Sequence, residues 1–355
     1  MTSKRVDEDR ERPLGAERYS KLSNAKDHAP DPSNNPILSR NARAYSGIFR
    51  TGVIQTRKPL GNFVAGSQMN LKNLLDPYSE KLMVQFEKVK RPKTRGQSAT
   101  QLDIATVIDP GKREYQEDAI LMDCPVGSDI GIVVVSDGMG GHAAGDIASK
   151  IVSTEVFNYW KFSGLNCLSS DAEVRECLMK AAEVANGCLR EVASRYSETR
   201  GMGATLLVLV LIESRAFWLS IGDSPLYRLR DGELCQMNED HSMAPQIDMM
   251  VKLGILDQQS AYEHPDRNTL TSVIMGGNIP KTDCPEHASH LEPGDILIAA
   301  SDGLQFLSEE RIQSIVAGNR SHQSEAIAGR LVKALKELDS PDQDNFAFSV
   351  IKFGG

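Results

Sequence analysis

The 355-residue sequence predicts an α+β fold in which β-sheets pack on each other and helices cover the outside. Three observations support this prediction. The strand-like segments fall into two groups with helical segments between and after them, whereas a parallel α/β fold would alternate strand and helix. Two apolar runs, 133–135 and 298–300, contain no polar residue, so each is expected to be a buried strand. Both runs lead into the same tripeptide, Ser-Asp-Gly, where glycine lets the backbone turn sharply.

The chain starts with a segment that lacks the pattern of a folded domain. Residues 1 to about 70 show neither the two-residue nor the 3.6-residue apolar period, and they are rich in Ser, Asn, Pro and Gly. One short helix is expected at 76–89, because Asp76 is a good N-cap and Pro77 suits the first helical position. We therefore expect an N-terminal extension at 1–98 that is mostly disordered.

The predicted compact domain covers 102–355 and opens with β-structure. Strands are expected at 103–108, 119–122 and 131–136. A Pro-Gly turn separates the first two of these strands. After a glycine-rich stretch at 138–145, a helix is expected at 146–160. A second long helix at 172–196 is indicated by apolar residues at helical spacing, namely Val174, Leu178, Ala181, Ala185 and Leu189.

The second half of the domain repeats this order of strands followed by helices. Strands are expected at 204–212, 216–221, 226–230 and 233–236, with turn residues between them. Helical patterns follow at 244–253, 309–316 and 324–338, and the last strand is expected at 346–353. The second buried run, 298–300, lies between the helical patterns at 244–253 and 309–316. We find no internal repeat of fixed period.

Composition excludes several classes of protein. Charged residues make up 25% of the chain, which is ordinary for a soluble protein. No apolar run approaches the ~20 residues that span a bilayer, and the charged start lacks the apolar core of a signal peptide. We therefore expect a cytoplasmic protein. None of the six cysteines forms a Cys-x-x-Cys pair, which favours reduced thiols over a disulfide framework or a zinc site.

The net charge of −8 hides an asymmetry between the two parts of the chain. Residues 1–100 carry 19 Lys and Arg against 10 Asp and Glu, a balance of +9. Residues 101–355 carry 21 against 38, a balance of −17. A basic extension beside an acidic domain could fold back over the acidic cleft, or it could dock on anionic lipid, nucleic acid or an acidic partner, so we hypothesise weak autoinhibition or targeting. The alternative is a solvated tail, and nucleic acid is not expected as a partner.

Acidic residues stand at the ends or turns of most of the expected core strands. Asp137 and Asp302 end the two buried runs, and the others are Glu117, Asp118, Asp223 and Asp344. Any one Asp-Gly or Gly-Asp pair is explained by a turn. The whole set is not, because crowded carboxylates repel each other unless cations neutralise them. Hard divalent cations need such oxygen clusters, so the sequence predicts a metal site.

These residues also carry a resemblance to a known family. From about 102 to 353 the chain resembles the metal-dependent serine/threonine phosphatases of the protein phosphatase 2C type, in their bacterial form. The order of the motifs makes the resemblance specific, since no single motif would. They are Arg-Glu-Tyr-Gln-Glu-Asp at 113–118, Val-Ser-Asp-Gly-Met-Gly-Gly-His at 135–142, Gly-Ala-Thr at 203–205, Ile-Gly-Asp-Ser at 221–224, Asp-His-Ser at 240–242, His-Pro-Asp-Arg-Asn at 264–268, Ser-Asp-Gly at 301–303 and Asp-Asn at 344–345.

The resemblance implies a four-layer αββα sandwich, in which two antiparallel β-sheets are flanked by helices, with a two-metal centre at one edge. It implies that Asp137 bridges both metal ions. Glu117 and the carbonyl group of Gly138 would hold one ion, and Asp302 and Asp344 would hold the other. The implied cofactors are two Mg²⁺ or Mn²⁺ ions.

The resemblance also implies roles in catalysis, for which Arg113, Asp118 and Asp137 are the candidates. Asp118 would orient metal-bound water, and Arg113 would grip the substrate phosphate. Asp223 and Asp302 would contribute to a third and weaker metal site. Gln116 stands where the family has Asn, and because both are amides we expect a supporting role with a longer reach.

The chemistry agrees with this reading. Two metal ions lower the pKa of a bridging water and clamp the oxygens of an in-line displacement. Carboxylate and water ligands suit Mg²⁺ and Mn²⁺. The predicted function is hydrolysis of phosphoserine and phosphothreonine in phosphorylated proteins by a metal-bridged water, which would reverse serine/threonine kinase signalling. The alternatives are a catalytically weak phosphoprotein-binding regulatory module, against which the complete ligand set argues, and a small-metabolite phosphatase.

Overall fold

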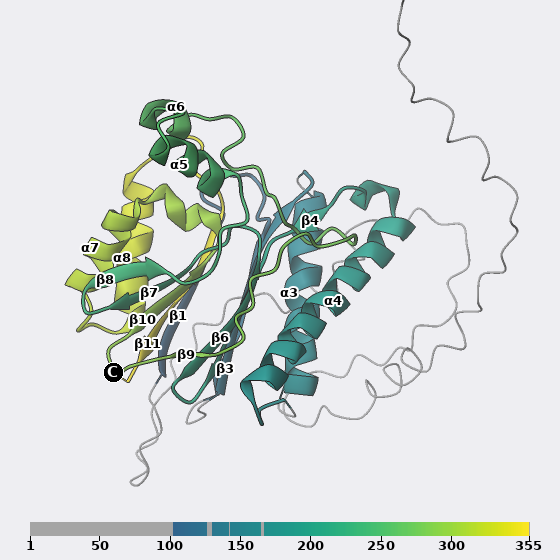
Figure 1. Ribbon diagram of the computed structural model, residues 1–355, viewed down its shortest axis with the longest axis horizontal. Coiled ribbons are helices and arrows are strands. Elements are labelled where there is room, and N and C mark those ends of the chain that lie inside the picture. Colours follow the sequence, from purple (N-terminus) through teal and green to yellow (C-terminus); the bar gives the residue numbers. More distant parts are fainter. Residues whose placement is uncertain (1–101, 126–129, 142, 165–166, 355) are drawn as a thin grey trace, which may run out of the picture. The chain divides into compact units, whose positions relative to one another are not determined.

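The computed structural model describes residues 102–125, 130–141, 143–164 and 167–354 (Figure 1). These ranges span nearly all of the predicted compact domain. The predicted extension at 1–98 and its helix at 76–89 lie outside the described residues, so both stay predictions from the sequence.

The secondary structure follows the predicted order. The first half contains β1 (Leu102–Asp109), β2 (Asp118–Asp123), β3 (Ile130–Met139), α3 (Ala143–Ser163), α4 (Asp171–Arg195), the 3₁₀ turn η3 (Ser197–Thr199), β4 (Gly203–Ala204), β5 (Leu206–Ile212), β6 (Arg215–Ile221), β7 (Leu226–Arg230) and β8 (Glu233–Gln236). The second half contains α5 (Ala244–Lys252), α6 (Gln258–Tyr262), β9 (Ser289–His290), β10 (Ile296–Ala300), the 3₁₀ turn η4 (Asp302–Phe306), α7 (Glu309–Gly318), α8 (Ser324–Glu337) and β11 (Phe346–Phe353).

Two antiparallel sheets form the centre of the described domain. The five-stranded sheet has the strand order β1-β11-β10-β7-β8. The six-stranded sheet has the order β2-β3-β5-β6-β9, and the short β4 pairs with β3 outside this path. Within the described ranges every strand pair is antiparallel, which is the arrangement expected when strands do not alternate with crossover helices.

Three apolar cores hold the domain together and define its layers. One core lies between the six-stranded sheet and α3 and α4, a second lies between the five-stranded sheet and α7 and α8, and a third lies between the two sheets. Figure 1 shows the two helix pairs on opposite outer faces of the stacked sheets. The described domain is therefore a four-layer αββα sandwich, and the predicted fold class is confirmed.

The pattern of the buried strand β3 follows from this stacking. Val134 packs in the core against α3 and α4, whereas Val133 and Val135 pack in the core between the sheets. Successive side chains of a strand point to opposite faces, so a strand covered on both faces must be apolar at every position. This explains why no polar residue interrupts the run at 133–135.

The helix α4 forms for local reasons as well as through packing. The Ser170 hydroxyl accepts a hydrogen bond from the Glu173 backbone N–H, which caps the first turn. One face buries Val174, Leu178 and further apolar residues at helical spacing against the sheet. The opposite face is polar, so the helix has one defined orientation on the sheet.

Three features of the described domain differ from the prediction. The strand expected at 204–212 is divided into β4 and β5, because Thr205 between them turns its backbone N–H to the Asp137 carbonyl. The five-residue helix α6 and the two-residue strand β9 were not expected from the sequence. Both are too short to give an apolar period.

None of the helices in the described ranges is both long enough and apolar enough to cross a membrane.

Candidate metal centre

The predicted site residues meet where strands of both sheets end. Asp118 opens β2 and is the direct register partner of Asp137 on the neighbouring strand β3. Asp223 follows the end of β6, Asp302 begins η4 directly after β10, and Asp344 lies two residues before β11. The strand pairing brings these ends to one edge of the sandwich, which is what the sequence predicted.

The two aspartates of the repeated Ser-Asp-Gly tripeptide lie close to each other. Asp137 belongs to the six-stranded sheet and Asp302 directly follows a strand of the five-stranded sheet. The charge of Asp302 contributes to the raised pKa of Asp137. A cation bound by both carboxyl groups would relieve this repulsion.

A second link between the sheets holds Asp118. The Ser301 hydroxyl donates to Asp118 Oδ2 at 2.6 Å and accepts a hydrogen bond from the Ala347 backbone N–H at 2.9 Å. Asp118 and Ser301 are both buried. The serine of the second tripeptide therefore fixes the orientation of the Asp118 carboxyl group, a function that its position before Asp302 does not reveal.

Asn345 positions the loop that carries Glu117. Its Oδ1 accepts from the Glu117 backbone N–H at 2.7 Å, and its Nδ2 donates to the carbonyl groups of Pro110 and Tyr115 at 2.9 Å. Gln116 supports the same loop, because its Oε1 accepts from the Asp118 backbone N–H at 2.9 Å. This local hydrogen bond is the support that Gln116 gives to the loop.

Thr205 fixes the backbone of Asp137 from the opposite side. Its backbone N–H donates to the Asp137 carbonyl at 2.8 Å, and its Oγ1 accepts from the Asp137 backbone N–H at 2.9 Å. The same Oγ1 lies 2.9 Å from the Ser224 hydroxyl, next to Asp223. Only glycine fits at position 222, since a Cβ atom there would lie 2.6 Å from the Thr205 side chain. The Gly-Ala-Thr motif at 203–205 and the Gly-Asp-Ser motif at 222–224 therefore pack against each other beside Asp137.

Two oxygens predicted to hold one ion lie around a single point. A Cβ atom at Gly145 would lie 2.8 Å from Glu117 Oε1 and also 2.8 Å from the Gly138 carbonyl oxygen. The Gly138 backbone N–H also donates to the Glu117 carbonyl at 3.1 Å. Glycines at 138 and 145 thus allow a close approach that leaves these two oxygens side by side, and oxygen donors of this kind suit a hard cation.

Burial and mutual repulsion disturb the ionisation of the cluster. Burial raises the pKa of Asp118 well above its ordinary value, and the charges of Asp302 and Asp344 raise it further. Burial and the neighbouring Asp118 raise the pKa of Asp137 in the same way. For Asp223, burial and then the charges of Asp302 and Asp240 raise the pKa to about 8. Gathering these carboxyl groups in their charged form is therefore costly, and a bound cation would offset that cost.

The cluster is not a closed coordination shell. Among the residues that the structure describes, no three His, Cys, Asp or Glu side chains are already arranged to hold a metal ion. The donors are carboxyl and carbonyl oxygens throughout, so the residues fit Mg²⁺ or Mn²⁺ in chemistry.

Arg113 lies at the edge of the cluster. Its Nη2 forms an ion pair with Asp344 Oδ2 at 2.8 Å, and 57% of its side-chain surface stays exposed. The guanidinium group is thus next to a predicted ligand and open to solvent, as a group that meets an incoming phosphate must be.

Comparison with known proteins agrees with this geometry. The family described as Protein phosphatase 2C matches residues 112–338, which is more than half of the chain. The chain belongs to the protein phosphatase 2C family. It is therefore a protein serine/threonine phosphatase, a class of phosphoric monoester hydrolase, and the resemblance stated from the motifs is confirmed.

Individual relatives in the phosphatase 2C family are bacterial. The chain is 32% identical over 193 residues to a putative protein phosphatase 2C-type of Streptococcus pyogenes, covering 54% of this chain and 75% of that protein. It is 33% identical over 189 residues to protein phosphatase PhpP of Streptococcus pneumoniae, covering 53% and 73%. The crystal structure of the serine/threonine phosphatase Stp1 of Staphylococcus aureus aligns with a TM-score of 0.61 and 25% identity, covering 75% of this chain and all of that chain.

The structure adds side chains that sequence reasoning missed. Ser301, Asn345 and Thr205 each hold a site carboxylate or its backbone through hydrogen bonds. All three are buried. Their only signal in the sequence was that each lies inside one of the quoted motifs, next to or near an acidic residue.

Proposed function

We propose that this phosphatase 2C family member hydrolyses phosphoserine and phosphothreonine in proteins at the acidic edge of the sandwich, with Mg²⁺ or Mn²⁺ as cofactor, and so opposes serine/threonine kinases. The observation that carries the proposal is the meeting of Asp118, Asp137 and Asp302 from two sheets: Asp118 is paired with Asp137 and is hydrogen-bonded to Ser301, the residue before Asp302. Bound metal ions would activate a water and stabilise the oxygens of an in-line displacement.

The chain's own residues divide the work of binding the ions. Asp137 lies at the centre, because it is close to Asp302 and is paired with the strand that carries Asp118. Glu117 and the Gly138 carbonyl group would bind on one side of Asp137. Asp302 would bind on the other side, together with Asp344, and Asp223 would add to a third and weaker site.

Two residues act on the substrate side. Asp118 is held by the Ser301 hydroxyl, so its carboxyl group has a fixed direction in which it can orient a water or accept its proton. Arg113 is exposed beside Asp344, and its planar fork suits two phosphate oxygens. A phosphate would compete with Asp344 for this guanidinium group, which leaves Asp344 available for a cation.

Hydrolysis of a phosphothreonine peptide, with Mn²⁺ or with a chelator, tests the proposal. We expect activity only with metal, and we expect Asp137→Asn to lower kcat/KM by about 10²-fold or more, as loss of a group that stabilises transition-state charge does. Asp342→Asn is the matched control, since it removes one charge at an exposed position two residues from Asp344. Full activity in chelator would overturn the metal-dependent mechanism.

The same experiment separates the alternatives. A phosphoprotein-binding module would bind the peptide without releasing phosphate, and a small-metabolite phosphatase would prefer free phosphomonoesters over the peptide. The comparisons favour neither alternative, because the relatives are protein phosphatases.

The basic extension remains a prediction from charge alone, because residues 1–101 lie outside the described ranges. A balance of +9 in 1–100 against −17 in 101–355 favours an inhibitory or targeting role. Deletion of 1–95 is then expected to raise activity at low ionic strength or to change the location of the protein in the cell, where a cytoplasmic place is predicted. Unchanged activity and location would show that the charge has no such role.

A further inference from the structure

Two exposed methionines lie beside the acidic cluster. Met139 ends β3 directly after Gly138, and 39% of its surface is exposed. Met275 follows Ile274 in the loop after α6, and 43% of its surface is exposed. Large apolar side chains that stay exposed at the edge of a polar site are a feature to explain, because they gain free energy when a ligand covers them.

The two side chains meet over one glycine. Met139 is the register partner of Gly203 on β4. A Cβ atom at Gly203 would lie 2.8 Å from Met275 Cγ and 3.4 Å from Met139 Cγ. The absence of a side chain at 203 therefore lets both methionines settle on the same patch of backbone, where they form one continuous apolar surface, here called the methionine lip (Met139 and Met275).

Hydrogen bonds hold the backbone beneath the lip. Ala204 and Ile274 exchange two backbone hydrogen bonds, at 2.9 and 3.0 Å. Thr205, which follows Ala204, binds Asp137 through its backbone and its hydroxyl. The lip and the central carboxylate are thus attached to neighbouring residues of the same segment, so their relative position is set.

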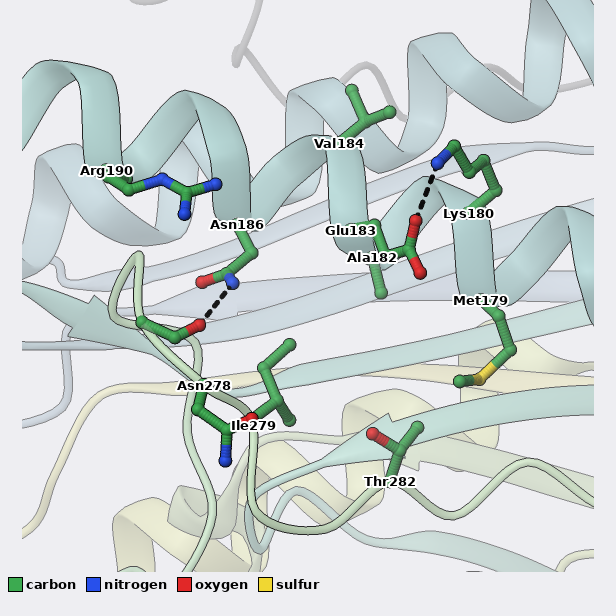
Figure 2. Close-up of a pocket in the computed structure, with 11 residues that line it drawn as sticks. Met179, Lys180, Ala182, Glu183, Val184, Asn186, Arg190, Asn278, Ile279 and Thr282 are labelled. Atoms are coloured by element: carbon green, nitrogen blue, oxygen red, sulfur yellow. Dashed lines mark hydrogen bonds and ion pairs between the residues drawn. The ribbon is translucent and has the colours of Figure 1, made fainter. Parts of the chain in front are cut away.

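A buried asparagine fixes the other side of the loop. Asn186 on α4 accepts from the Gly276 backbone N–H through Oδ1 and donates to the Gly277 carbonyl through Nδ2, both at 2.7 Å. Figure 2 shows Asn186 reaching from α4 to this loop, at one side of a pocket of about 530 Å³. Gly276 has φ +80°, and a Cβ atom there would lie 2.6 Å from the Arg190 Cα. Met275 is therefore carried by an anchored loop.

We propose that the methionine lip binds the side chain next to the phosphorylated residue of a protein substrate, and that it makes the enzyme prefer apolar neighbours. This rests on the proposed function. Continuity with the cluster identifies the occupant, because Met139 is adjacent to Gly138, whose carbonyl group is a predicted ligand. A phosphate at the cluster places the residues that flank it over the lip. Unbranched thioether side chains adapt to different apolar shapes, so the preference is for a class of residue.

The test uses two pairs of phosphothreonine peptides. In the first pair the residue before the phosphothreonine is Leu or Gln, and in the second pair the residue after it is Leu or Gln; the rest of the sequence is the same. The full chain is assayed with Mn²⁺, and kcat and KM are measured separately. We expect wild type to prefer Leu in one pair. We expect Met275→Ala to reduce that preference about threefold to tenfold, mainly through KM, since a partly covered apolar contact is lost.

Two further variants make the result specific. Met275→Leu keeps an apolar side chain of similar volume, so it should retain the preference for Leu. Met122 is similarly exposed, at 40%, but lies near the end of β2 that is remote from Asp118. Met122→Ala should therefore leave kcat and KM for both peptides unchanged. If Met275→Ala acted only on the structure, it would lower kcat/KM equally for the Leu and the Gln peptide. That result would contradict the proposal.

The outcomes of the two proposals are distinguishable. The wild-type enzyme could hydrolyse all peptides without a preference, or Met275→Ala could leave the preference intact. Either result overturns the proposed role of the methionine lip, while the phosphatase function stands. Failure of wild type to hydrolyse any of the peptides overturns the proposed function and the lip together.

Discussion

At the scale of single residues, the Ser301 hydroxyl fixes the orientation of the Asp118 carboxyl group. Its hydroxyl binds Asp118 and the Ala347 backbone in a buried position between the sheets. A buried polar atom that loses its partner costs about 1–3 kcal/mol. The serine is thus expected to matter for stability and for the direction of the Asp118 carboxyl group.

We predict that Ser301→Ala lowers the free energy of unfolding by about 1–3 kcal/mol, because two hydrogen bonds of buried groups are lost. It should also lower kcat more than it raises KM, since Asp118 acts on the water rather than on substrate binding. Urea unfolding and peptide kinetics check both effects. Ser321→Ala, at an exposed position, should change neither. Wild-type kcat in Ser301→Ala would argue against the role of Asp118.

A second prediction at this scale concerns Gly138. A Cβ atom there would lie 2.0 Å from the Gly145 carbonyl oxygen and 2.8 Å from the Glu117 carbonyl oxygen. Both obstacles are backbone atoms, so Gly138→Ala must displace the loop that carries the predicted ligands. We expect weaker Mn²⁺ binding by calorimetry and a lower melting temperature. Unaltered Mn²⁺ affinity would mean that the Gly138 carbonyl group is not a ligand.

At the scale of secondary structure, α4 both covers the sheet and positions the loop that bears Met275. Its Asn186 is buried and makes two hydrogen bonds to that loop. Asn186→Ala should lower the free energy of unfolding by about 1–3 kcal/mol, because two backbone groups lose their partner. Hydrogen exchange should speed up at Gly276. Glu176→Ala, exposed on the same helix, is the control, and equal exchange in both variants would contradict the anchoring.

The helix α8 allows a prediction of opposite sign. Gly329 lies in its interior at an exposed position, and a Cβ atom there would have no neighbour within 4 Å. Alanine stabilises a helix interior relative to glycine by about 0.5–1 kcal/mol. We expect Gly329→Ala to raise the free energy of unfolding by this amount with kinetics unchanged. A loss of stability would show that the helix needs glycine for a contact.

At the scale of the whole molecule, the site depends on the stacking of the two sheets. Asp118, Asp137 and Asp223 come from the six-stranded sheet, whereas Asp302 and Asp344 come from segments next to the five-stranded sheet. A cation bound between them would therefore tie the two halves of the sandwich together. Anything that binds only the folded state stabilises it by mass action.

We accordingly predict that Mn²⁺ raises the melting temperature of the protein, with about 2.7 kcal/mol of stabilisation at a concentration of 100 Kd. Asp137→Asn should abolish most of this shift, because Asp137 is the predicted bridge. Asp342→Asn should retain it. A wild-type melting temperature that does not respond to Mn²⁺ or Mg²⁺ would contradict the metal centre.

The prediction from sequence succeeded where the signal was local. The bounds of β7, β8 and β11 agree with those expected, because turn residues delimit them: Asp231 and Gly232 separate β7 from β8, and Gly354 follows β11. The helix α6 was missed, since five residues capped by Asp257 carry no apolar period. The strand β9 was missed because it exists only through its pairing with Arg215 and Ala216.

The sequence by itself determined which residues take part: two buried runs that end in Ser-Asp-Gly, acidic residues at other strand ends, and a motif order that identifies the phosphatase 2C family. Only the tertiary structure decided that Asp137 and Asp302 lie close together, that Ser301 holds Asp118, and that Met139 and Met275 meet over Gly203. The physical reason is distance along the chain. Such contacts join residues that only the pairing of strands and the packing of two sheets bring together, and no local pattern records them.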